Sequence, residues 1–130
     1  MDDFAHEQLD VYRISTEFLI LADAVSNSLP RGRAYLADQL RRAALSIPLN
    51  IAEGAGEFAH DEKTRFYRIA RRSTTECAAI LDGCRLLELA DQDRLVQGRA
   101  LLLRIVAMLT ALVLRMRNSG SGSGSDAGSG

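Results

Sequence analysis

Residues 39–54 read QLRRAALSIPLNIAEG, and this stretch decides the fold because it describes an amphipathic helix with a proline in its interior. Its apolar residues recur every three or four positions, which is the period of a helix that buries one face. Pro48 lacks a backbone N–H, so the carbonyl of Ala44 loses its helical partner, at a cost of about 3 kcal/mol and usually with a kink. Polar residues recur along a second face, and they are Arg42, Ser46, Asn50, Glu53 and Glu57. The stretch therefore predicts a helix that carries a polar stripe beside a proline.

The same periodicity outside this stretch predicts three further helices. The expected helices cover residues 7–28, 33–53 and 61–89, with a fourth after Asp91. Because the connections between them are short, consecutive helices should run antiparallel. The sequence therefore predicts an all-α fold, an antiparallel up-down-up-down four-helix bundle, formed by a single domain of residues 1–118.

Local signals predict where the helices end. Gly54 and Gly56 should stop the second helix, since glycine readily adopts the left-handed conformation that ends helices. Asp61 and Asp91 are placed to cap the N-termini of the third and fourth helices. Residues 119–130 consist almost entirely of serine and glycine, which is the composition of a flexible linker and of a tail added for expression. We therefore set this tail apart from the folded domain.

Several classes of protein do not fit the sequence. The acidic first residues differ from the positively charged start of a secretory signal, and no stretch reaches the roughly 20 apolar residues of a membrane span. Cys77 and Cys84 are two helical turns apart on one face, so we expect two buried free thiols rather than a metal or redox pair. The expectation is a cytoplasmic protein without a membrane partner.

Catalytic motifs are also missing from the sequence. His6 and His60 are far apart, and neither an HExxH motif nor a phosphate-binding glycine loop occurs. Glu53 and Glu57 are one helical turn apart and could reach one metal ion, but the Glu-x-x-His partner of di-metal bundles is absent. The sequence therefore predicts no enzyme, no catalytic residue, no cofactor and no metal.

Charge is segregated along the chain. Residues 1–30 carry a net charge of −5, residues 31–72 carry +4 and residues 73–118 carry +1. Fifteen of the sixteen cationic residues are arginine, the cation that pairs bidentately with phosphate or carboxylate. Two interpretations are open: the acidic first helix neutralises its neighbours within the bundle, or a basic patch faces a nucleic acid.

The basic segment supplies the candidate nucleic-acid-binding residues. Three of them recur at i, i+3 and i+7 on one face of the third helix, and Tyr35 and Tyr67 are near enough in sequence to stack on bases. Neighbouring carboxylates, such as those of Asp38 and Glu62, could instead neutralise the patch. The candidates are Arg33, Arg41, Lys63, Arg65, Arg68, Arg71 and Arg72.

The polar stripe also has two interpretations. In the first, Arg42, Ser46, Asn50 and Glu53 form a structural network in which Asn50 or Ser46 satisfies the freed carbonyl of Ala44. Glu53 would then pair with Arg68 or Arg72 of the third helix, since a buried charge needs a partner. In the second, the stripe lines a small pocket for a ligand or an RNA phosphate.

The expected fourth helix is apolar around most of its circumference. Besides its core face it presents a second apolar face, formed by Leu101, Leu103, Ala107, Met108 and Leu114. A surface helix of a monomeric bundle should have one apolar stripe and a polar remainder. Because no helix is fully enclosed in a four-helix bundle, we expect the protein to self-associate over this face. The sequence alone predicts only an oligomer, with a dimer as the default.

Three segments together resemble a known family. They are residues 9–13 (LDVYR), 41–54 (RRAALSIPLNIAEG) and 66–76 (FYRIARRSTTE). They are similar to the bacterial four-helix bundle proteins first named as proteins encoded in 23S ribosomal RNA intervening sequences, over residues 6–117. Arg72 departs from the pattern, because relatives usually have glycine before the serine.

The resemblance implies a bundle that closes into a ring, with a homopentamer as the expected assembly. The accessory variability protein of diversity-generating retroelements is a related bundle, a basic homopentamer that works with nucleic acid and a reverse transcriptase. The neutral body of this chain departs from that basic relative.

Two functions therefore compete. The first is non-catalytic binding of structured RNA by an oligomeric bundle with a basic surface. The second is a structural or protein-interaction module, an oligomeric scaffold whose partner is another protein. The two differ in whether Arg65, Arg68 and Arg72 are free or paired.

Overall fold

The computed structural model describes residues 4–129, with side chains up to residue 118. Within these residues the chain forms four α-helices and two short 3-10 helices, and no strand. The all-α fold is therefore confirmed. The elements are η1 (Ala5–Gln8), α1 (Asp10–Ser28), η2 (Arg31–Arg33), α2 (Ala34–Gly56), α3 (His60–Leu86) and α4 (Gln92–Ser129).

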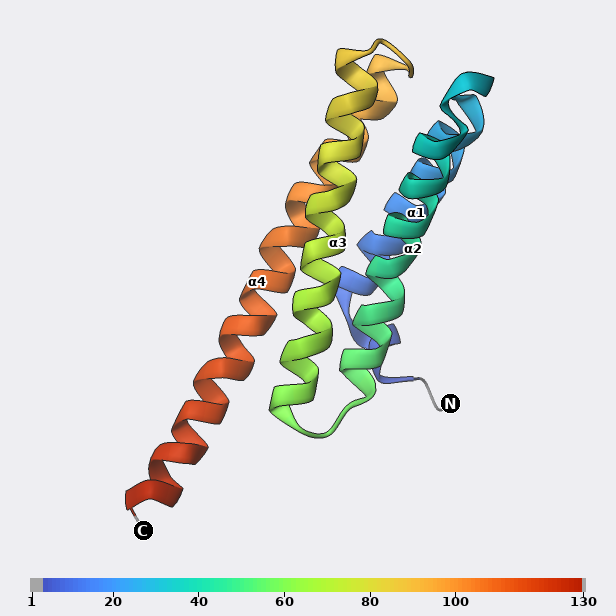
Figure 1. Ribbon diagram of the computed structural model, residues 1–130. Coiled ribbons are helices and arrows are strands. Elements are labelled where there is room, and N and C mark those ends of the chain that lie inside the picture. Colours follow the sequence, from blue (N-terminus) through green and yellow to red (C-terminus); the bar gives the residue numbers. More distant parts are fainter. Residues whose placement is uncertain (1–3, 130) are drawn as a thin grey trace.

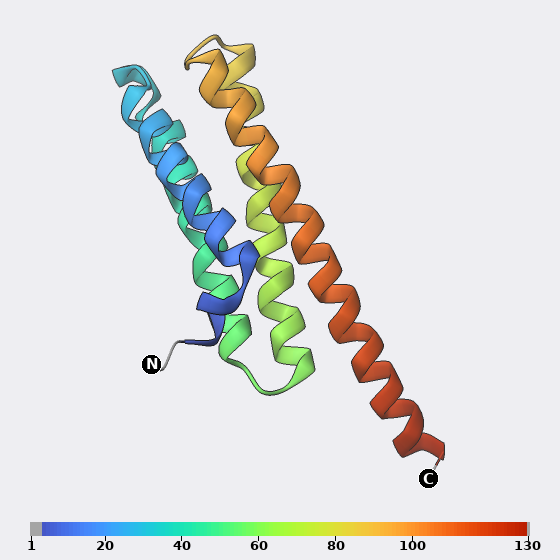
Figure 2. The ribbon, with the colours of Figure 1, turned by 180° about the vertical axis from the view of Figure 1, so that it is seen from behind.

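The four helices run alternately up and down, as Figures 1 and 2 show from opposite sides. Each helix packs against its neighbour in the chain, and α1 also packs against α4, which closes the bundle. At the end where α2 connects to α3, α4 continues past the other helices (Figure 1). The expected antiparallel four-helix bundle is confirmed.

The bounds of α4 include most of the tail that the sequence predicts to be a flexible linker. The helix runs to Ser129, whereas the described side chains end at Asn118. The division into a domain of residues 1–118 and a linker of residues 119–130 stays a prediction, because the side chains of the tail lie outside the described residues.

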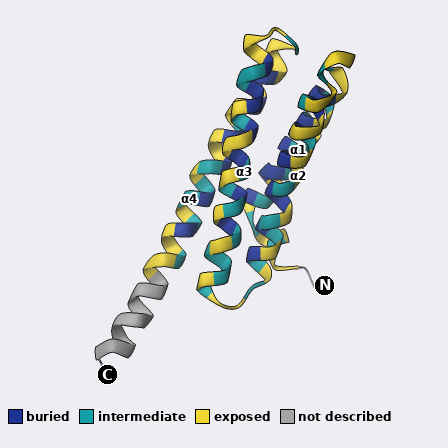
Figure 3. Cartoon of the chain, viewed as in Figure 1, coloured by how far each residue is buried: buried dark blue, intermediate teal, exposed yellow. Residues whose placement is uncertain are grey.

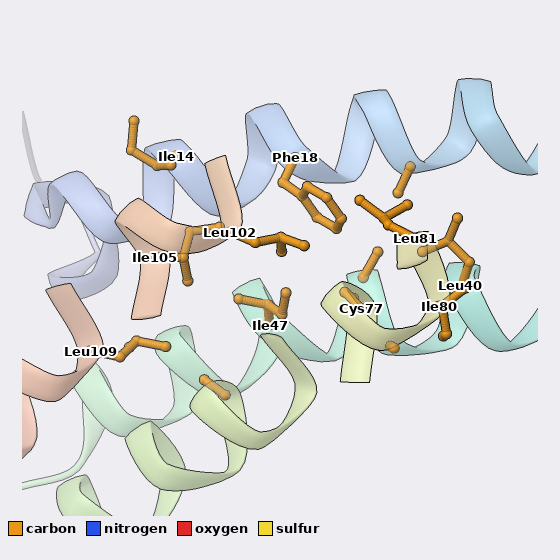
Figure 4. Close-up of a cluster of buried hydrophobic side chains, with 14 of the residues drawn as sticks. Ile14, Phe18, Leu40, Ile47, Cys77, Ile80, Leu81, Leu102, Ile105 and Leu109 are labelled. Atoms are coloured by element: carbon orange, nitrogen blue, oxygen red, sulfur yellow. The ribbon is translucent and has the colours of Figure 1, made fainter. Parts of the chain in front are cut away.

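Apolar side chains from all four helices meet in one core (Figure 4), and Figure 3 marks the buried residues on each helix. The largest fully buried side chains include Phe18 from α1, Leu40 and Ile47 from α2, and Ile105 and Leu109 from α4. Burying each such side chain contributes about 1.5–3 kcal/mol. The core holds the walls of the candidate site in place, because α3 and α4 both contribute to it.

Cys77 and Cys84 of α3 lie in this core as free thiols, as predicted. Burial, together with the nearby Glu76 carboxylate, raises the pKa of the Cys77 thiol to about 12. Burial also raises the pKa of Cys84. Both side chains therefore act as small apolar residues, since the thiolate is the reactive form of cysteine.

The prediction that α2 stops at this glycine pair is confirmed at Gly56, the last residue of the helix, but it is wrong for Gly54 and for the left-handed conformation. The helix includes both glycines, and neither has a positive φ. Gly54 is buried beneath Tyr67 of α3, and a Cβ at this position would lie 2.7 Å from Cε1 of the tyrosine ring. Lys63 Nζ donates to the carbonyls of Gly54 and Ala55, at 3.2 and 3.1 Å, and so satisfies the end of the helix. Gly54 therefore permits close packing of α2 on α3.

Of the two predicted N-caps, one is confirmed. The backbone N–H of Arg94 donates to Asp91 Oδ2 at 3.1 Å, so Asp91 caps α4. The Asp61 prediction is wrong, because α3 begins at His60 and Asp61 lies within its first turn. Ala59 precedes the helix and provides no side-chain cap. The carboxylate of Asp61 instead interacts favourably with the positive end of the helix dipole.

Helix α3 ends at Leu86 rather than at residue 89. The Leu89 N–H donates to the carbonyl of Cys84 at 2.9 Å, and the Glu88 N–H donates to the carbonyl of Arg85 at 3.1 Å. This pair of bonds is a Schellman motif, which needs a left-handed residue directly after the C-cap. Glu88 takes that conformation, with φ of 55°.

Candidate nucleic-acid interface

The candidate arginines of α3 line a groove against α4. Arg65, Arg68 and Arg72 are exposed on one face of α3, as their spacing predicts, and Arg117 lies across from them on α4. The hollow that these four residues line has a volume of about 850 Å³, and we call it the arginine groove. His60 and Asp61 lie at the end of the groove where α3 begins, and Asp61 is the acidic residue among those that line it.

Most of the cations in the arginine groove have no partner within the part of the chain that the structure describes. Arg68, Arg72 and Arg117 form no hydrogen bond or ion pair with any described residue. Arg65 pairs with Glu62 at 3.6 Å and lies over the Phe66 ring, but its side chain is 62% exposed. Such an exposed pair contributes about 0–1 kcal/mol and exchanges readily for another anion. The groove therefore presents cations that the fold itself does not neutralise.

Arg71 has a different role from its neighbours. Its guanidinium donates to Thr110 Oγ1 of α4 at 3.4 Å, and the residue is half-buried between the two helices. A second hollow of about 520 Å³ continues the basic surface past Arg68, Arg71 and Arg72 towards Glu76. Arg71 thus helps to hold α3 against α4 and borders the surface that Arg68 and Arg72 share.

The remaining candidate cations lie outside the groove and have intramolecular partners. Arg41 donates to Asn27 Oδ1 at 2.7 Å and lies 3.6 Å from Asp38 and 3.9 Å from Asp23. The acidic first helix therefore neutralises part of α2. Arg33 donates to the Tyr35 hydroxyl at 3.3 Å, and Lys63 caps α2 as described above.

The two tyrosines differ from the expectation that both could stack on bases. Tyr67 is only 3% exposed and packs on Gly54, and burial raises the pKa of its hydroxyl. Tyr35 is 59% exposed but lies on α2, outside the groove. Phe58 was not among the predicted site residues, yet it is 98% exposed in the α2–α3 connection. The sequence feature that could have indicated this residue is a single large apolar side chain in segment 54–62, whose other residues are small or polar.

The polar stripe of α2 forms a smaller network than expected. Asn50 Nδ2 donates to the Ser46 carbonyl at 2.8 Å and to Ser46 Oγ at 3.0 Å, so its acceptor is Ser46 and not Ala44. Ser46 Oγ is also hydrogen-bonded to Ser73 Oγ of α3 at 2.8 Å. The stripe thus joins α2 to α3 through three short polar side chains.

The two charged members of the stripe stay outside this network. Arg42 and Glu53 are exposed and form no hydrogen bond or ion pair with a described residue. The expected ion pair between Glu53 and Arg68 or Arg72 is therefore not formed. An exposed carboxylate remains hydrated and needs no protein partner, which is why the network does not extend to it.

In the described part of the chain, no group of three or more His, Cys, Asp or Glu side chains could hold a metal ion. None of the helices described there combines the length and the apolar character that crossing a membrane would need.

The fold and the site define the class of this protein, a small all-α bundle with a basic surface groove. Residues 7–111 match the family described as the 23S rRNA-intervening sequence protein, and the chain belongs to that family. Comparison with the curated proteins finds no match. The match covers the α3 wall of the arginine groove and ends before Arg117 of the α4 wall. The relation to the retroelement accessory protein and the assembly into a ring stay expectations.

Proposed function

We propose that this protein is a non-catalytic, self-associating bundle that binds structured RNA through the arginine groove. The observation that carries the proposal is that Arg68 and Arg72 are exposed and have no partner among the described residues, whereas Arg41, Arg71 and Lys63 have partners within the bundle. The family description links its members to ribosomal RNA, which supports RNA as the polyanion. We propose the cytoplasm as the site of action, which suits a protein with two reduced, buried thiols.

The neutral body of the chain does not oppose this function. Segregated charge creates a local positive potential over α3, and it is the local potential that attracts a polyanion. Each guanidinium can form two parallel hydrogen bonds with a phosphate, and the binding of several phosphates releases counterions. In an oligomer the groove recurs on every protomer, so that a modest local affinity is multiplied by multivalency.

Self-association is the second part of the proposal. Helix α4 presents exposed apolar side chains at steps of three or four residues. We call this set the apolar stripe, and it consists of Val96, Ala100, Leu103, Ala107, Ala111 and Leu114. Leu103 is 59% exposed and Leu114 is 48% exposed, whereas Leu101 and Met108 pack partly on the core. Such a stripe favours contact with a further helix, and we propose a homopentameric ring as the family resemblance implies.

The apolar stripe also supports the alternative function. A bundle that assembles through α4 could serve as a structural or protein-interaction module without binding RNA. Under this alternative, the cations of α3 contribute to assembly or to contact with a partner protein.

Charge reversal of the groove separates the two functions. The variant Arg68→Glu/Arg72→Glu removes two phosphate contacts, and the control Arg13→Glu/Arg99→Glu makes the same change in net charge at two arginines that pair with Glu17 and Asp82. We expect the groove variant to bind a structured RNA about 100-fold more weakly, since a hydrogen bond to a charged group contributes about 1.5–3 kcal/mol. Fluorescence anisotropy measures the affinity, and light scattering after gel filtration measures the assembly.

The control variant should retain most of the affinity, and both variants should keep the assembly of the unaltered protein. Equal losses in the two variants would assign binding to net charge alone and would contradict the groove. If the groove variant loses its assembly instead of its affinity, the structural module is the better function.

A further inference from the structure

Phe58 is an aromatic residue that the fold does not use. It lies between the last residue of α2 and the first of α3 and is 98% exposed. Its immediate neighbours in the chain are Glu57 and the small residue Ala59, and the polar residues His60 and Asp61 follow, so it does not extend an apolar patch of the kind seen on α4. Burial of this side chain within the bundle would have been favourable. Its exposure leaves the ring free to contact another molecule.

The position of Phe58 places it at the end of the arginine groove. It comes two residues before His60, which lines the groove, so the two Cα atoms are within about 7 Å. The α2–α3 connection lies at the end of the bundle past which α4 continues (Figure 1). The two walls of the groove, the start of α3 and the later part of α4, therefore both lie at the end of the bundle that carries Phe58.

The arginines of α3 form a row that leads away from Phe58. A helix rises about 1.5 Å per residue, so Arg65, Arg68 and Arg72 are separated along the axis by about 4.5 and 6 Å. Sites for single strands combine such a positively charged track along the backbone with an aromatic side chain on which a base stacks. Phe58 and the arginine row supply both parts.

A duplex would not use Phe58 in this way. The bases of an A-form helix are stacked on one another, and its deep, narrow major groove excludes side chains. Unpaired bases of loops, bulges and strand ends present a free face to an aromatic ring. An aromatic residue at the end of a cationic groove therefore favours RNA that has unpaired nucleotides.

We propose that the arginine groove takes unpaired nucleotides of RNA, with one base stacked on Phe58 and the adjoining phosphates held by Arg65, Arg68 and Arg72. The inference rests on the proposed RNA-binding function and narrows its substrate to loops, bulges and single-stranded ends.

Phe4 offers a matched control. It is also exposed, at 72%, but it borders a hollow that Glu53 and Glu57 line, and its ring stacks on His6 at 5.7 Å. No arginine or lysine is among the residues that line this hollow, so Phe4 lacks the cationic track that a nucleotide needs. Phe4→Ala removes an exposed phenyl ring without changing the proposed site.

The test compares two RNAs with the same number of phosphates, a hairpin with an unpaired loop and a blunt duplex. Anisotropy titrations use the full chain and the variants Phe58→Ala, Phe58→Tyr and Phe4→Ala. We expect the unaltered protein to prefer the hairpin, and Phe58→Ala to bind the hairpin about 10-fold more weakly while its duplex affinity is unchanged. Phe58→Tyr and Phe4→Ala should retain the hairpin affinity. Because Phe58 lies outside the core, circular dichroism should be the same for all variants.

The outcomes separate this inference from the function on which it rests. If Arg68→Glu/Arg72→Glu weakens binding but Phe58→Ala does not, the groove binds RNA and the stacking role is overturned. Equal losses of Phe58→Ala for hairpin and duplex also overturn it. If the arginine variant has no effect on either RNA, the proposed function itself fails.

Discussion

Gly54 lets α2 pack closely on α3, because a residue with a Cβ would collide with the Tyr67 ring. A glycine after an amphipathic run is typical of a helix end, which is why the sequence predicts a stop there. The Tyr67 ring that packs on Gly54 belongs to another helix, so no local sequence pattern predicts this contact. Asn50 is a similar case. The sequence predicts a polar side chain beside Pro48, but it does not predict that the acceptor is the Ser46 carbonyl.

The two glycines of α2 should respond in opposite directions to alanine. Gly54→Ala places a Cβ 2.7 Å from Tyr67 Cε1, and we expect overpacking of this kind to lower the free energy of unfolding by about 1–3 kcal/mol. Gly56→Ala meets no atom within 4 Å and should raise the free energy of unfolding by about 0.4–1 kcal/mol. Urea unfolding measures both. A stabilising effect of Gly54→Ala would contradict the close approach of α2 and α3.

At the scale of the elements, the existence of four helices was predictable because each is long and strongly periodic. The ends of the helices were predictable only where the signal is local. Asp91 caps α4 through a bond to Arg94, three residues along the same segment, and the sequence predicts it. The end of α2 depends on Lys63 of α3, which is a contact between helices and therefore escaped the prediction.

The end of α3 offers a test of element design. Glu88 occupies the left-handed position of a Schellman motif, where a residue with a Cβ is strained by about 1–2 kcal/mol. We expect Glu88→Gly to raise the free energy of unfolding by about 1 kcal/mol. The same substitution at Glu76, in the exposed middle of α3, should lower the free energy of unfolding by about 1 kcal/mol, and thermal or urea unfolding compares the two. Destabilisation in both variants would show that the Glu88 side chain stabilises the protein by more than its left-handed backbone conformation costs.

At the scale of the whole molecule, the arginine face of the candidate site was predictable and its surroundings were not. The spacing of Arg65, Arg68 and Arg72 places them on one face in any helix. Their freedom from partners, and the burial of Tyr67, depend on how α3 packs against α2 and α4. Arg117 is part of the site because α4 continues beside the first half of α3.

The apolar stripe should control the assembly of the molecule. Leu103→Glu places a charge in the middle of the stripe, and we expect it to convert the oligomer into monomers, since burying an unpaired carboxylate is costly. Leu86→Glu makes the same change at a leucine that is 69% exposed at the end of α3 and should leave the assembly unchanged. Light scattering after gel filtration gives the mass of each. A monomeric mass for the unaltered protein would contradict the role given to α4.

The salt dependence of RNA affinity tests the central claim most directly. The full chain is titrated against a hairpin RNA by fluorescence anisotropy at several salt concentrations. If the arginine groove holds about three phosphates, the logarithm of the association constant should fall linearly with the logarithm of salt concentration, with a slope of about −2 for each occupied groove. An absence of binding at low salt, or an affinity that does not change with salt, would contradict the claim that the unpaired arginines of α3 bind RNA.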